Sequence, residues 1–226
     1  AALAEQLLYV KVIISNFNDS LANFALLAAA WFGSGLLPDD RRAGAHALLF
    51  SRPLSRFDYV LGRLAHASGF AALAVLVPGI IVCLVATFTS PQWSFVTEEP
   101  DTIGWTVAFA TCWSLAVGLF VLAISSVAKR KSHALIAFFG GLFVITAGSA
   151  ALIELTDDQR WTWLSPILDF DVLRIRVFGA VRSGPHDAWL KVDAELARGA
   201  LLSLIAWVAA AVLVLTVRVR TLEAVR

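Results

Sequence analysis

Five long runs of apolar residues constrain this chain more than any other feature of its sequence. The runs cover approximately residues 17–38, 60–89, 104–128, 133–154 and 199–217. About 20 residues of helix cross a hydrocarbon layer about 30 Å thick, so each run is long enough to span a membrane. Of the 226 residues, 59% are hydrophobic and only 15% are charged, which excludes an ordinary soluble domain. We therefore predict a polytopic membrane protein with five spans in this chain.

The runs predict helices and not strands. Leu, Ala, Val, Ile and Phe follow one another without the alternation that a strand of a transmembrane barrel shows. Backbone polar groups in lipid must be paired internally, which an α-helix achieves by itself. The expected fold class is an all-α helical bundle, with residues 1–226 forming a single transmembrane domain.

Basic residues are concentrated on one side of the predicted bundle. Residues 39–63 contain five arginines, the turn at 129–131 reads Lys-Arg-Lys, and the C-terminal tail adds three arginines. Lys and Arg accumulate in cytoplasmic loops, so we expect these segments and the C-terminus in the cytoplasm. The expected location is a bacterial-type inner (cytoplasmic) membrane, with residues 155–198 as an outer loop. Five spans would then leave residue 1 outside, so we expect one further span before it and six in the full protein.

Catalytic and metal-binding patterns are missing from the sequence. No ionisable residue lies near the middle of a predicted span, and the four His and two Cys lack the spacing of metal ligands. The G-x-x-x-x-G match at residues 179–184 is followed by Pro185 and His186, where a phosphate loop needs Lys and Ser or Thr. We expect no enzyme activity, metal or cofactor in this chain. Transport would therefore draw its energy from another subunit.

The basic segment after the first run begins with signals for a short helix. Asp39 and Asp40 can cap a helix that starts near Arg41 and runs to Phe50, where their charges favour the positive end of its dipole. Pro53 then ends this helix, because the residue before a proline is forced out of helical geometry.

A second helix is predicted directly after the proline. Ser55 and Asp58 form an S-x-x-D capping box, and the helix continues through Tyr59 into the second span. Two capped helices with a fixed break favour a docking element for a soluble partner. The alternative is an ordinary cytoplasmic loop with a helix on the membrane surface.

The order of these residues resembles the ABC-2 type family of ATP-binding-cassette exporter permeases. That family has small residues, an acidic-Arg pair and a Gly, then Ser-Arg-Pro-x-Ser-Arg, a Tyr and a Gly-Lys pair. Arg63 stands here where Lys is usual, which keeps the charge. The matching residues are Gly33, Gly35, Asp40, Arg41, Gly44, Ser51, Arg52, Pro53, Ser55, Arg56, Tyr59 and Gly62.

The resemblance implies a permease half that pairs with a second permease subunit, in a homodimer or a heterodimer, and with two ATPase subunits. ATP and Mg²⁺ would be bound by the ATPases, and no nucleic acid is expected as a partner. Segment 39–59 would be the coupling helix that seats in the ATPase. The residues expected to couple to the ATPase are Asp40, Arg41, Arg42, Gly44, Arg52, Pro53, Ser55, Arg56 and Tyr59.

Other interpretations stay open from the sequence. The favoured function is the transmembrane subunit of an exporter; a non-transporting membrane anchor or sensor is the alternative. An intramembrane enzyme is least supported, because no polar constellation is expected at membrane depth. Within the outer loop, residues 167–178 fit a short strand or an interfacial helix, and the resemblance favours a helix. No residue is predicted to bind the substrate.

Overall fold

The computed structural model describes residues 20–43, 56–90, 94–98, 100–178, 190 and 192–221. These residues are almost entirely helical and contain no strand. Five of the described helices are long and apolar enough to cross a membrane, which confirms the predicted all-α class. They are Ser20–Asp40, Phe57–Thr89, Pro100–Val127, Lys131–Thr156 and Ala194–Arg218.

The first described helix covers residues 20–33, turns at 34–35 and continues as α2 (Leu36–Arg42). The other long helices are α4 (Arg56–Thr89), α6 (Pro100–Val127), α7 (Lys131–Thr156) and α9 (Ala194–Thr221). Between them lie α5 (Ser94–Glu98), the 3₁₀ helix η2 (Gln159–Leu164) and α8 (Pro166–Phe178).

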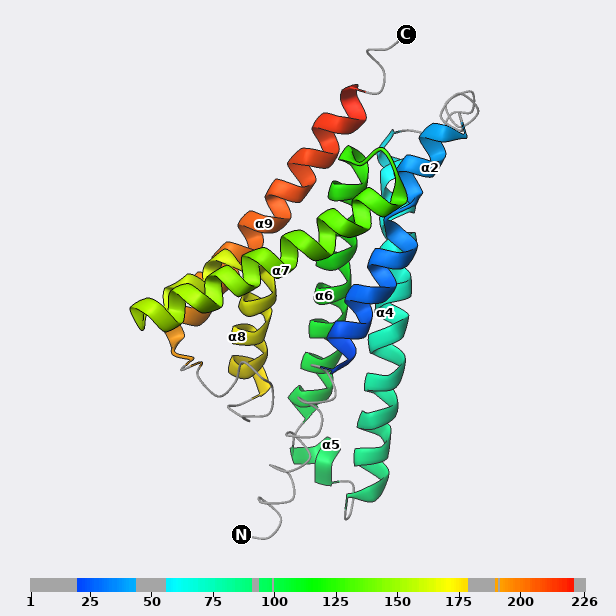
Figure 1. Cartoon of the computed structure of the whole chain (residues 1–226). Coiled ribbons are helices and arrows are strands. Elements are labelled where there is room, and N and C mark those ends of the chain that lie inside the picture. The colour runs from blue at the N-terminus through cyan, green and yellow to red at the C-terminus, as the bar shows by residue number, and fades with distance from the viewer. Residues whose placement is uncertain are drawn as a thin grey trace.

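Helix α6 lies at the centre of the bundle (Figure 1). It packs along α4 and also contacts α2, α7, α8 and α9. Gly118 allows the close approach to α4, because a Cβ atom there would lie 2.9 Å from the Cβ and 3.0 Å from the backbone nitrogen of Ser68. Small residues at such crossings let helix backbones pack closely in membranes.

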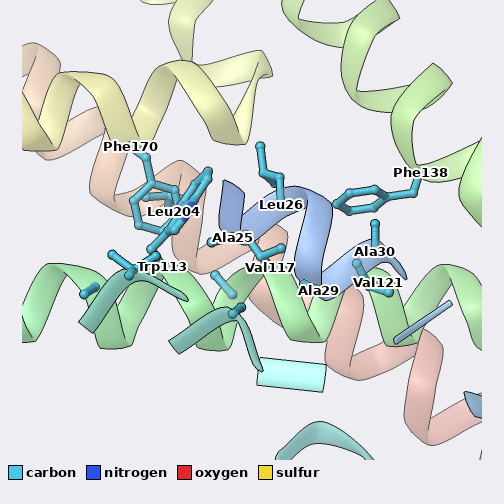
Figure 2. Close-up of a cluster of buried hydrophobic side chains, with 14 residues drawn as sticks. Ala25, Leu26, Ala29, Ala30, Trp113, Val117, Val121, Phe138, Phe170 and Leu204 are labelled. Carbon is cyan, nitrogen blue, oxygen red and sulfur yellow. The ribbon is translucent and has the colours of Figure 1, made fainter. Parts of the chain in front are cut away.

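The largest apolar core lies where α6 meets the first helix and α8 (Figure 2). The indole ring of Trp113 packs edge-on against Phe170 of α8, with ring centroids 4.1 Å apart. Its Nε1 also donates a hydrogen bond of 3.1 Å to the Ala22 carbonyl of the first helix. Other buried members of this core are Ala25, Leu26, Ala29, Ala30, Val117, Val121, Phe138 and Leu204.

The segment between α7 and α9 folds back against the bundle. Ser165 precedes α8, where its Oγ accepts a hydrogen bond from the Leu168 amide and Pro166 takes the first helical position. The Ser165 hydroxyl also pairs with the Thr146 hydroxyl of α7 at 2.8 Å. Thr146 lies about 15 Å along α7 from its end at Thr156. The stretch that the sequence left open between strand and helix is therefore a helix, packed deep between its neighbours.

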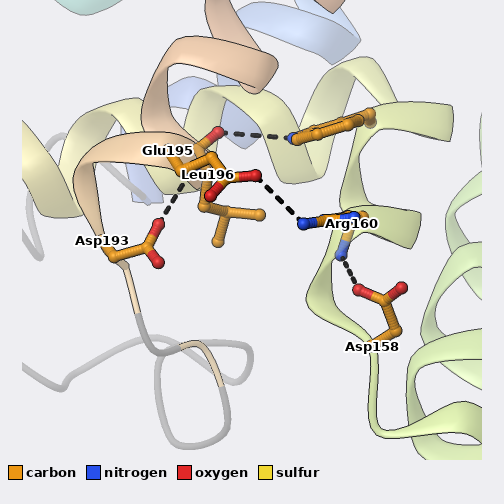
Figure 3. Close-up of polar contacts among 6 residues, drawn as sticks. Asp158, Arg160, Asp193, Glu195 and Leu196 are labelled. Carbon is orange, nitrogen blue, oxygen red and sulfur yellow. Dashed lines mark hydrogen bonds and ion pairs between the residues drawn. The ribbon is translucent and has the colours of Figure 1, made fainter.

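Polar contacts tie η2 to the beginning of α9 (Figure 3). Arg160 pairs with Glu195 at 3.0 Å, and the Trp163 indole donates to the Leu196 carbonyl at 3.3 Å. The indole ring also covers Gly199, where a Cβ atom would lie 2.0 Å from it. Both helix starts are capped by aspartates, which are Asp158 and Asp193.

The helix after the first span begins earlier than the sequence predicted. α2 starts at Leu36, so Asp39 lies in its first turn and does not cap a helix that begins near Arg41. The chain turns at residues 34–35 instead. Pro38 does not interrupt α2, because amide groups in a first helical turn have no partner within the helix. The prediction failed because it ended the first span at residue 38 and started the next helix only near Arg41.

We predict that Gly118→Ala lowers the free energy of unfolding by about 1–3 kcal/mol, since the added methyl group overpacks the α4–α6 contact. Gly104→Ala is the matched control on the same helix, because nothing lies within 4 Å of its added Cβ atom. The control should be neutral or stabilising by up to about 1 kcal/mol. Thermal unfolding of the detergent-purified proteins measures both effects. Equal melting temperatures for the two variants would contradict the close packing at Gly118.

Candidate functional site

The segment that the sequence singled out starts and finishes at one end of the bundle (Figure 1). α2, the start of α4, the α6–α7 turn and the C-terminal part of α9 lie together there. We call this region the basic end. The basic residues at this end whose side chains the structure describes are Arg42, Arg63, Lys129, Arg130, Lys131 and Arg218.

Asp40 of α2 is bonded to two side chains on the first turns of α4. The Tyr59 hydroxyl donates a hydrogen bond of 2.6 Å to Asp40 Oδ2, and the Arg63 guanidinium forms an ion pair with the same oxygen. Arg63 also lies over the Tyr59 ring, 5.4 Å from its centroid, within cation–π range. The Asp40 side chain is 15% exposed, so solvent screens these contacts less than it screens a surface pair. We call these three residues the Asp40 cluster.

The Asp40 cluster joins the two ends of residues 44–55. α2 ends at Arg42 on one side of this segment, and α4 begins at Arg56 on the other. The hydrogen bond and the ion pair cross from one helix to the other directly.

A hydrogen bond from α6 compensates for the break before α2. In a continuous helix the Ser34 carbonyl would accept from the amide of residue 38, but Pro38 has no amide hydrogen. The Ser125 hydroxyl of α6 donates to this carbonyl at 3.0 Å, and the bond is buried. α2 is thus attached to α6 at its beginning and to α4 near its end.

Apolar packing and a cation–π contact stabilise the same end of the bundle. Leu37 of α2 belongs to a buried cluster whose other members come from α4, α6 and α9. The Lys131 ammonium at the start of α7 lies 4.7 Å from the ring centroid of Trp31 on the first helix. The buried partners of Leu37 in this cluster are Tyr59, Ala67, Leu122, Ala123, Ala211 and Leu215.

The structure brings together two of the predicted coupling residues, Asp40 and Tyr59. Arg42 is exposed at the end of α2. Arg41 and Arg56 lie on described helical backbone at the end of α2 and the start of α4. The other predicted coupling residues lie outside the described residues; they are Gly44, Arg52, Pro53 and Ser55. Most of the predicted helix to Phe50 and its proline break lie outside them as well.

Two residues of the site were not predicted to be part of it. Arg63 carried a usable signal, because it follows Tyr59 by four residues and so shares its helix face. Ser125 carried none. Thr106 and Ser114 on the same helix donate to carbonyl groups of α6 itself, and the sequence does not distinguish Ser125 from them.

An apolar groove of about 220 Å³ lies farther along the bundle, between α6, α7 and α9. Pro166, at the start of α8, closes part of its wall. Small residues such as Gly141 and Ala210 line it, and such residues let helices approach one another closely in membranes. No group of three or more His, Cys, Asp or Glu able to hold a metal ion occurs among the residues that the structure describes.

We predict that Tyr59→Phe and Asp40→Asn each lower stability by about 1.5–3 kcal/mol, because each removes a hydrogen bond between a polar and a charged group. The double variant should lose less than the sum of the two single losses, with a coupling energy of about 0.5–3 kcal/mol. Unfolding of the four proteins in detergent gives this value. Glu195→Gln is the control, since its ion pair with Arg160 is exposed and worth less than about 1 kcal/mol. Additive losses would show that the contact contributes nothing.

Comparison with protein families matches nearly the whole chain. The model of a family described as ABC-2 family transporter protein matches residues 2–221. No curated protein matches the chain. The family match includes the Asp40 cluster and all five candidate spans.

Proposed function

The chain belongs to the ABC-2 transporter permease family, and from this premise we propose that it is the permease subunit of an ATP-driven exporter. As a family member it is a multi-pass membrane permease component of an ABC transporter, and its family works in general with an ABC ATPase. The proposal adds the direction of transport, out across a bacterial-type inner membrane. It also assigns the binding of ATP and Mg²⁺ to a separate subunit.

We propose that residues 39–59 dock on the ATPase and transmit its motion. The observation that carries this proposal is the Asp40 cluster, which holds α2 and α4 together at the two ends of the segment. Ser125 links the same unit to α6, the central helix. A rigid-body displacement of the docked segment would therefore move three helices and not a loop alone.

The proposed orientation places the basic end in the cytoplasm. The Lys and Arg residues at this end lie on α2, α4, the α6–α7 turn and α9. They support a cytoplasmic location for the end of α9 and for the site where the ATPase would bind. A second permease subunit, identical or different, would complete the transporter. Large exposed side chains on α7 support such a partner or direct lipid contact, since Ile136, Phe143 and Val144 are 68–73% exposed.

We predict that Arg52→Glu or Pro53→Ala weakens association with the ATPase while the protein still inserts into the membrane. Reversing a charge in the docking segment should reduce co-purification of the co-expressed ATPase by about tenfold, which corresponds to about 1.4 kcal/mol. Arg160→Gln is the control, because Arg160 lies on η2, away from the basic end. Unchanged co-purification and unchanged ATP hydrolysis in both docking variants would reject residues 39–59 as the coupling segment.

We predict a different result for Asp40→Asn, which loosens the link behind the docking surface. The ATPase should remain bound, but its hydrolysis should lose its dependence on the permease. ATPase activity of the complex, compared with that of the free ATPase, measures this coupling. A permease that binds no ABC ATPase at all would instead favour the non-transporting anchor.

A further inference from the structure

Asp169 is an ionisable residue enclosed within the bundle. It lies in the first turn of α8, and its side chain has no solvent exposure. Neither carboxylate oxygen has a hydrogen-bond partner among the described residues. An ionised carboxylate in such a place is strongly disfavoured, because burial removes its water and nothing replaces it. The protonated, neutral form avoids most of this penalty.

The surroundings of Asp169 come from two membrane-spanning helices. Ser165, just before α8, bonds to Thr146 of α7, and the Trp163 carbonyl accepts a hydrogen bond of 2.6 Å from Ser203 of α9. Thr146 and Ser203 lie well inside the candidate spans Lys131–Thr156 and Ala194–Arg218, respectively. The segment between α7 and α9 thus places a carboxyl group level with the interior of these two spans, where the spans themselves carry no carboxyl group.

Burial raises the pKa of Asp169 to about 7, and the nearby Ser203 hydroxyl opposes the rise. Ser203 has a single hydroxyl proton, and it donates this proton to the Trp163 carbonyl. The hydroxyl is therefore not free to stabilise an ionised carboxylate. The dipole at the N-terminus of α8 also favours the ionised form. Its contribution is smaller than the cost of burying the charge. Burial remains the dominant effect.

No charged group offsets the burial of Asp169 among the described residues. Its own helix carries the buried Asp171–Arg174 ion pair and Arg176, and none of them contributes to the shift. No charged side chain of α6, α7, η2 or α9 contributes to the shift either. The charged groups on those neighbouring elements lie toward the helix ends. They include Glu154 of α7, Arg160 of η2, and Glu195 and Arg198 of α9.

We propose that Asp169 is a proton-binding site that holds α8 against α9. The carboxyl group carries a proton while α8 is packed in the bundle, and its ionisation favours release of α8. The group is fully enclosed, so a proton fits where a larger cation does not. Pro166, in the same first turn, lines the apolar groove between α6, α7 and α9, so loosening of α8 would open that wall. This inference does not depend on the ATPase assignment.

The proposal fixes the direction of the pH dependence. The folded-state pKa of Asp169 lies above the unfolded value of about 3.9, so the folded protein binds more protons between these values. Stability must therefore fall as the pH rises from about 4 to about 7, and the loss is complete above that range. Between pH 5 and pH 8 this group should raise the unfolding equilibrium constant on the order of 100-fold.

We predict that Asp169→Asn, which keeps the shape without the charge, removes this part of the pH dependence. Melting temperatures of the purified protein at pH 5 and pH 8 test it, with Asp157→Asn as the control. Asp157 is exposed and adopts a left-handed conformation that Asn tolerates, so the control should behave as wild type. Infrared difference spectra should also show the carbonyl band of a protonated acid at pH 5, absent at pH 9 and absent in Asp169→Asn.

Two results would overturn the proposal. The first is a wild-type spectrum at pH 5 without the band, because the carboxyl group would then be ionised in the packed state. The second is an Asp169→Asn variant with the wild-type band and pH dependence, which would move the site to another group. The wild-type spectra decide the question by themselves if the Asn variant fails to fold.

Discussion

The bundle depends on hydrogen bonds that α6 donates to the backbone of the first helix. Trp113 donates to the Ala22 carbonyl and Ser125 to the Ser34 carbonyl, so the two helices are joined at two levels. In apolar surroundings a carbonyl group without a donor is costly, and Pro38 leaves Ser34 without one. The hydrogen bond from Ser125 therefore offsets the cost of the break before α2 and sets where α2 begins. The position of Asp40 beside α4 follows from that start.

The two ends of the molecule use ion pairs differently. At the opposite end, Arg160 and Glu195 are 62% and 72% exposed, and such a pair contributes little to rigidity. At the basic end, Asp40 shares one carboxylate oxygen between a hydroxyl and a guanidinium group, beside the buried Leu37 cluster. Polar groups whose hydrogen bonds are satisfied inside a protein make the structure around them more rigid. The basic end has such a group in Asp40, as the coupling role that we propose for this end requires.

The sequence was sufficient for the spans and for the start of α4, because long apolar runs and a capping box are local signals. It was not sufficient for α2, since a proline is read as a breaker although the first turn of a helix accepts it. The Asp40–Arg63 pair joins residues far apart along the chain, and no helical periodicity relates them. The depth of α8 was also hidden, because residues 167–178 alternate charged and apolar side chains and their period does not show which face is buried.

Helix α8 shows why apolar runs alone do not describe the polar groups inside this bundle. Arg174 is buried beside Asp171, with 3.8 Å between their charged atoms, so each charge partly offsets the burial of the other. Asp169, on the same helix, is buried with no hydrogen-bond partner among the residues that the structure describes. A helix with these three groups does not enter an apolar layer by its own hydrophobicity. Phe170 packs against Trp113 of α6, and Val172 and Ile175 share a buried cluster with α9, so α6 and α9 together hold α8 in place.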